Sequence, residues 1–153
     1  MEDRRWKIGG CNDIRRFGGV EQARALVNKI YCLTREDSSL AKDFGLASQV
    51  QRAAVSIMSN VAEGFERTHL AEKIQFYNVA RGSTGEVRSL LYVISDNYPQ
   101  SAADAERLRA TAISVGKLTS GLLRSTEQRK GRLTRATSLL LSPISYLLAS
   151  LSR

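Results

Sequence analysis

The chain has 153 residues, of which 42% are hydrophobic and 25% charged, a balance typical of one soluble globular domain with a single core. Its formal net charge is +8, and the excess of Lys and Arg lies mostly in residues 1–16 and 124–153. Basic ends attract polyanions without reading a base sequence, although solvated tails that aid solubility explain the same charge. Two isolated cysteines and a single histidine argue against a structural zinc site and favour a reducing cytoplasm.

Residues 1–18 combine charges with paired glycines and show no apolar period, which predicts a flexible basic arm. The first ten residues, MEDRRWKIGG, lack the apolar core of a secretory signal. The longest apolar run, Leu139–Leu151, is too short to span a bilayer and contains Pro143. We therefore expect a cytoplasmic location and disfavour a membrane.

Apolar residues recur every three or four positions through residues 19–126, which predicts four helices and an all-α class. The first helix covers Val20 to Arg35. The second begins at Leu40 or after Asp43 and ends near Phe65, with Gly64 as its stop signal. Short connections between helices of this size favour an antiparallel up-down-up-down four-helix bundle.

The third predicted helix starts at Thr68, a good N-cap residue, and ends at the Asn97-Tyr98-Pro99 break. The fourth starts at Ser101 and ends near Arg124 or Thr126. Glycines at the ends of the Gly82–Gly85 segment predict that another backbone packs closely against the third helix. A phosphate-binding glycine loop is disfavoured there, because no strand precedes it and no GK[ST] follows.

A line of polar side chains follows the second helix opposite its apolar stripe. Aligned polar residues can set the register between packed helices or subunits, whereas a solvated face tolerates any polar residue. With one glutamate from the third helix, they are the candidates for a polar network within the bundle or at a subunit interface: Gln49, Arg52, Ser56, Asn60, Glu63 and Glu86.

Residues 127–153 divide into a basic half, RKGRLTR, and an apolar half, LLLSPISYLLASL. Three interpretations stay open for this tail: a fifth helical segment packed on a neighbour, a helix on a membrane surface, or a disordered segment. Its serines and Pro143 argue against one long regular helix.

Catalytic chemistry has little support in the residues. His69 is the only histidine and has no Ser or Cys partner in a recognisable motif. Glu63 and Glu86 could meet across two helices, but di-iron bundles use Glu-x-x-His motifs, which are missing here. We therefore expect no enzyme activity, no catalytic, cofactor-binding or metal-binding residues, and no small-molecule substrate.

Nucleic-acid binding is the more specific hypothesis. No zinc finger, RNP motif or helix-turn-helix signature occurs, so binding would use backbone charge and shape. The alternatives are a solvated basic face, or an oligomeric adaptor that binds another protein and no nucleic acid. The candidate nucleic-acid-binding residues are Arg67, Lys73, Arg81, Arg88, Arg129, Lys130 and Arg132.

Three segments resemble a known family: IYCLT (Ile30–Thr34), FGLASQVQRAAVSIMSNVAEGFER (Phe44–Arg67) and FYNVARGSTGEV (Phe76–Val87). The second is similar to the pattern FGL-x-x-Q-x-R-R-A-x-x-S-I-x-x-N-I-A-E-G of four-helix-bundle proteins encoded by intervening sequences in 23S rRNA genes. The accessory variability protein of diversity-generating retroelements is related to that family. Val20 stands where members often have tryptophan, and the tail after residue 130 has no counterpart.

The resemblance implies a homopentameric ring of four-helix bundles in the cytoplasm, without enzymatic activity. For the retroelement relatives it implies binding to a reverse transcriptase and to RNA or DNA through basic surface residues. For the intervening-sequence relatives it implies no defined process. Because one fold serves many functions, nucleic-acid binding by this chain stays a hypothesis.

Overall fold

A computed structural model describes residues 18–151 of the chain, with the side chains of residues 18–137. The described part contains five helices and no strand, which confirms the all-α class. The predicted arm lies outside it, apart from Gly18, with which the first helix begins. The helices are α1 (Gly18–Glu36), α2 (Ser38–Lys42), α3 (Phe44–Glu66), α4 (Leu70–Asn97) and α5 (Ala102–Leu151).

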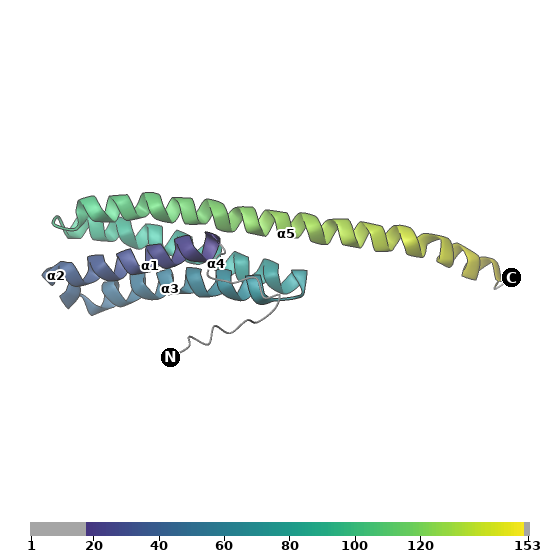
Figure 1. Cartoon of the computed structure of the whole chain (residues 1–153), viewed down its shortest axis with the longest axis horizontal. Coiled ribbons are helices and arrows are strands. Elements are labelled where there is room, and N and C mark those ends of the chain that lie inside the picture. The colour runs from purple at the N-terminus through teal and green to yellow at the C-terminus, as the bar shows by residue number, and fades with distance from the viewer. Residues whose placement is uncertain (1–17, 152–153) are drawn as a thin grey trace, which may run out of the picture.

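The four long helices run alternately up and down and pack side by side, with short α2 at the corner between α1 and α3 (Figure 1). Helix α1 contacts α3 and α5, and α4 contacts the same two helices from the other side. Within the described residues, no helix is long and apolar enough to cross a membrane.

The core consists of the apolar stripes that the helical period predicts. On α3, Val50, Ala53, Ile57 and Val61 are all buried, which agrees with their spacing of three and four residues. The largest fully buried side chains come from all four long helices and from α2: Leu26, Ile30, Leu40, Val50, Ile57, Val61, Val87, Leu91, Ile94, Val115 and Thr119.

Two aspartates connect the α1–α2–α3 corner to the turn between α4 and α5. Asp37 caps α2 by accepting hydrogen bonds from the backbone N–H groups of Ser39 (2.9 Å) and Leu40 (3.1 Å). Its other oxygen accepts a hydrogen bond of 2.8 Å from the Ser101 hydroxyl. The Ser101 hydroxyl first, and then the Leu40 N–H, lower the pKa of Asp37 because they stabilise its carboxylate.

Asp43 has the equivalent role at the start of α3. Its carboxylate accepts from the Leu46 N–H (3.0 Å) and from the Tyr98 hydroxyl (2.8 Å). These two donors, in that order, lower the pKa of Asp43, and the bond to its carboxylate raises the pKa of Tyr98. The same end of the bundle is therefore held by two carboxylates, each of which caps one helix and binds one α4–α5 residue.

The predicted end of the second helix near Phe65 is confirmed to within one residue, but its predicted stop signal and the predicted N-cap of the third helix are wrong. Gly64 does not stop the second helix: it is buried inside α3, which continues to Glu66. A Cβ atom at Gly64 would lie 2.5 Å from Cε1 and 2.8 Å from Cδ1 of Tyr77, so the glycine makes room for a ring on α4. The N-cap of α4 is His69 and not Thr68, and the His69 side chain makes no capping hydrogen bond.

The predicted end of the fourth helix is also wrong. Helix α5 has 50 residues and continues through Pro143 to Leu151, so the segment after Thr126 prolongs it without a break. Its second half projects beyond the other helices (Figure 1). At 1.5 Å per residue the helix is about 75 Å long. The basic half of the tail is thus a helical extension of the bundle.

Close packing against Gly82 and Gly85 is not found within the described part of this chain. A Cβ atom at either position would have no atom within 4 Å, and both residues are exposed on α4. The close approach occurs one helix away, where a Cβ atom at Gly116 on α5 would lie 3.1 Å from Cγ2 of Thr84.

Candidate functional site

A groove of about 560 Å³ lies between α4 and α5, and four of the residues that line it are basic. The two helices are antiparallel neighbours, so residues from the middle of α4 face residues from the first half of α5 (Figure 1). Helix α4 contributes Arg81, Thr84, Gly85 and Arg88, and α5 contributes Ile113, Gly116, Lys117, Ser120, Gly121 and Arg124. We call this surface the α4–α5 groove.

Charge in the α4–α5 groove has one sign. Arg81, Arg88, Lys117 and Arg124 line it, and no acidic residue does. Within residues 18–137, none of the four forms a salt bridge with a carboxylate. Cations held close together without counter-charges create a positive potential that attracts anions.

Glycines keep the groove open between its cations. A Cβ atom at Gly85 or Gly121 would meet no atom within 4 Å, so the helix surface has free space at both positions. Gly116 lets Thr84 pack closely, which brings α4 and α5 together in the middle of the groove. A ligand backbone can therefore approach the helices between side chains that carry positive charge.

The basic face of α5 continues past the end of the bundle. Lys117, Arg124 and Arg135 follow one another at intervals of seven and eleven residues, which places them on one side of a helix with 3.6 residues per turn. Arg132 lies within about 60° of this line, whereas Arg129 and Lys130 point to other sides. All residues from 127 to 137 are exposed, and Glu127 is the only acid among them.

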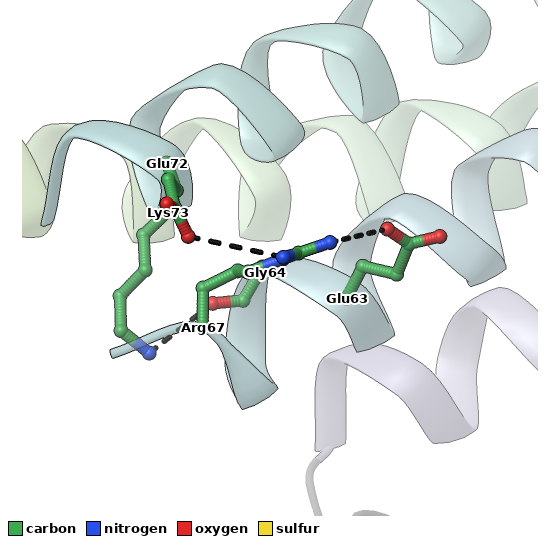
Figure 2. Close-up of polar contacts among 5 residues, drawn as sticks. All are labelled: Glu63, Gly64, Arg67, Glu72 and Lys73. Atoms are coloured by element: carbon green, nitrogen blue, oxygen red, sulfur yellow. Dashed lines mark hydrogen bonds and ion pairs between the residues drawn. The ribbon is translucent and has the colours of Figure 1, made fainter. Parts of the chain in front are cut away.

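Two predicted nucleic-acid-binding residues have local structural partners at the junction of α3 and α4 (Figure 2). Arg67 lies 3.4 Å from the Glu63 carboxylate and 3.9 Å from that of Glu72, and its guanidinium stacks 4.8 Å from the centre of the Phe76 ring. Lys73 donates hydrogen bonds to the carbonyls of Gly64 (3.1 Å) and Phe65 (2.7 Å), which are among the last carbonyls of α3. The structure does not bring Arg67 and Lys73 into the α4–α5 groove, whereas Arg81 and Arg88 line it.

The residues of the predicted polar network form separate hydrogen bonds between α3 and α4 and within α3. The Gln49 amide donates to Glu86 at 3.4 Å. The hydroxyls of Ser56 and Ser83 are 2.8 Å apart, and the Asn60 amide donates to the Ser56 carbonyl at 2.7 Å. The first two bonds tie α3 to α4 within one chain, whereas the bond from Asn60 lies inside α3. Arg52 is exposed, and its side chain has no hydrogen bond or ion pair with a described residue.

Other reactive groups in the described range are isolated. His69 is exposed, and no three potential metal ligands lie close together in residues 18–137. The Cys32 thiol donates to the Glu36 carboxylate at 2.8 Å, and this bond is the main reason that the pKa of Cys32 is raised. A thiol with a raised pKa is a weak nucleophile at neutral pH.

Lys117 and Arg124 are missing from the nucleic-acid-binding candidates that the sequence predicts, although both line the groove. A signal was present: Arg81 and Arg88 are seven residues apart on one helix, and Lys117 and Arg124 are seven apart on the next. Two such pairs on antiparallel neighbours can line a common groove.

A family model described as 23S rRNA-intervening sequence protein matches residues 17–121. A solved structure of a protein of unknown function from the S23 ribosomal protein family of Bacteroides thetaiotaomicron is 18% identical in sequence. It superimposes with a TM-score of 0.61, over 69% of this chain and 97% of that one, and so supports the fold. Comparison with curated proteins finds no similar sequence. Since the family model covers more than half of the chain, the protein belongs to the family of 23S rRNA-intervening sequence proteins.

Proposed function

We propose that the protein is a non-enzymatic, oligomeric cytoplasmic scaffold that binds the phosphate backbone of nucleic acid in the α4–α5 groove. The observation that carries the proposal is the set of four cations, Arg81, Arg88, Lys117 and Arg124, which line one groove without an acidic neighbour in it. Phosphates that enter the groove supply the missing counter-charge. Binding releases condensed counterions from the nucleic acid, which drives association without sequence readout.

The projecting half of α5 extends the proposed binding surface. Lys117 and Arg135 are 18 residues apart on one helix face, a distance of about 27 Å along the axis. A nucleic acid that lies in the groove would therefore meet further cations on the same side of α5. Arg129 and Lys130 add charge on the remaining sides of this exposed segment.

The test is a titration of labelled RNA and DNA with the full chain at several salt concentrations. We expect Arg88→Gln and Lys117→Gln to weaken binding to both nucleic acids and to reduce its salt dependence. Arg24→Gln on α1 is the matched control, because Arg24 is exposed, lies outside the groove and has no ion pair among residues 18–137. Absence of binding at low salt, or an equal loss for Arg24→Gln, would contradict the proposal.

A second candidate function, a protein-binding adaptor without a nucleic-acid role, is favoured by the outer face of α4. Val79 and Val93 are 46% and 43% exposed there, on the same side as Gly82, at which a Cβ atom would meet nothing. An exposed apolar face with an open glycine suits a helix from another chain. Together with the family resemblance, it supports a homo-oligomer, for which we propose a pentamer. Size exclusion with light scattering tests the oligomeric state, and a monomer at micromolar concentration would contradict the proposed homo-oligomer.

A further inference from the structure

An exposed aromatic ring continues the α4–α5 groove at the end opposite Arg124. Tyr92 follows Arg88 by four residues on α4, so both side chains lie on the same face of the helix. Tyr92 also lies beside α5, because the Arg109 side chain of α5 packs over its ring. Tyr92 is 51% exposed, although it is a large apolar residue.

The position of the Tyr92 ring is held by its neighbours. The Arg109 guanidinium lies 4.0 Å from the ring centre, which is a close cation–π contact. Arg109 is itself fixed by an ion pair of 3.3 Å with Glu106, and its side chain is only 19% exposed. One face of the ring is therefore covered by Arg109, and about half of the surface of Tyr92 is exposed to solvent.

A positively charged groove next to an exposed aromatic ring is the combination that binds single-stranded nucleic acid. The cations hold the phosphates, while the ring stacks on a base. In a duplex the bases stack on one another and are closed to a side chain, so a duplex could use the cations alone. We infer that the α4–α5 groove selects single-stranded over double-stranded nucleic acid, and that Tyr92 stacks on an unpaired base whose phosphate contacts Arg88.

This inference rests on the proposed function, because it adds a strand preference and a base contact to the same groove. The free space at Gly85 agrees with it. Gly85 lies between Arg81 and Arg88 on α4, and a Cβ atom there would have no neighbour within 4 Å. A single strand is narrow enough to occupy that space, whereas a duplex would rest on the long cationic side chains at the edges.

The experiment compares two probes by fluorescence anisotropy: a labelled single-stranded RNA of about 12 nucleotides, and the same strand annealed to its complement. The full chain is titrated at about 50 and 200 mM salt. We expect the single strand to bind more tightly. Tyr92→Ala and Tyr92→Leu should weaken its binding at least about fivefold and leave duplex binding unchanged.

Tyr92→Phe is the matched control, because it keeps the ring and the contact with Arg109, and it should bind like the parent chain. Circular dichroism and thermal unfolding of each variant establish that the bundle is intact, and Tyr92→Leu preserves apolar packing if Tyr92→Ala does not fold. Equal affinity for the two probes, or an unchanged affinity of Tyr92→Leu for the single strand, overturns the inference. If Arg88→Gln still weakens both probes, the proposed function survives that result. If Arg88→Gln has no effect on either probe, both are wrong.

Discussion

Substitution by alanine should have opposite effects on stability at Gly64 and at Gly82, because only Gly64 has a side chain packed against it. Both lie inside helices of the bundle, in α3 and α4. Alanine favours a helix interior over glycine by about 1 kcal/mol, and a side chain at Gly82 would meet no atom within 4 Å. In a single bundle, in which the Gly82 position is open, we therefore expect Gly82→Ala to raise the free energy of unfolding by up to about 1 kcal/mol.

Gly64→Ala gains part of the same helix propensity but forces a methyl group against Tyr77. The new Cβ atom would lie 2.5 Å from Cε1 of the ring, closer than real Cβ contacts come, and Tyr77 is only 3% exposed. Overpacking of this kind costs about 1–3 kcal/mol. Since the propensity terms largely cancel, the two variants should differ by about that amount.

Thermal and urea unfolding of both variants measure this difference. In a chain of this size 1 kcal/mol corresponds to about 2–4 °C in the melting temperature, so Gly64→Ala should melt roughly 2–12 °C below Gly82→Ala. Tyr77→Leu removes the ring, and in that background the penalty at Gly64 should shrink, which a double-mutant cycle detects. Equal melting temperatures for the two alanine variants would refute the reasoning about the Tyr77 contact.

Four further predictions concern the ends of α3, the corner and the basic surface. Lys73→Met removes two hydrogen bonds to the last carbonyls of α3 and should lower the free energy of unfolding in urea by about 1 kcal/mol, whereas exposed Lys42→Met should not; equal effects would contradict it. Asp37→Asn should lower stability near neutral pH and flatten the acid side of a melting-temperature profile. The pKa of Asp37 in the folded chain lies below its ordinary value of 3.8. Its contribution to the free energy of unfolding is therefore present above pH 3.8 and is lost as the pH falls through the lowered pKa. An unchanged acid side of the melting-temperature profile in Asp37→Asn would exclude this role. A chain that ends at Gln128 should keep its melting temperature, because residues 129–137 are exposed and this part of α5 projects beyond the other helices (Figure 1), and should bind RNA more weakly; unfolding of the bundle would contradict this. Arg88→Gln should reduce the slope of log affinity against log salt by about 0.7–0.9, and an unchanged slope would place Arg88 outside the interface.

The sequence predicts the core well, because a helical stripe such as Val50, Ala53, Ile57 and Val61 reports burial directly. The role predicted for Gly64 is wrong because a glycine is needed there for a tertiary contact, which the local sequence does not show. A glycine near the end of an apolar stripe resembles a stop signal unless Tyr77, thirteen residues later, is known to pack on it.

The length of α5 was missed for a different reason. Serines and Pro143 suggested an interruption, but a formed helix is extended without new nucleation, and the residues that follow Thr126 include Glu, Gln, Arg, Lys and Leu, which favour helix. The candidate site was half predicted. Arg81 and Arg88 were identified from their charge, whereas Lys117 and Arg124 join them only because α5 packs antiparallel beside α4.

Because α5 is one continuous helix, the directions in which its outer side chains point are fixed relative to those of the residues inside the bundle. One residue inserted after Gln128 would rotate Arg135 by 100° and shift it by 1.5 Å, taking it out of line with Lys117 and Arg124. Seven inserted residues would bring it back to within about 20° of that line, at a distance larger by about 10 Å. The length of the insertion therefore decides whether the outer charges change their distance from the groove alone or also the side of the helix on which they lie.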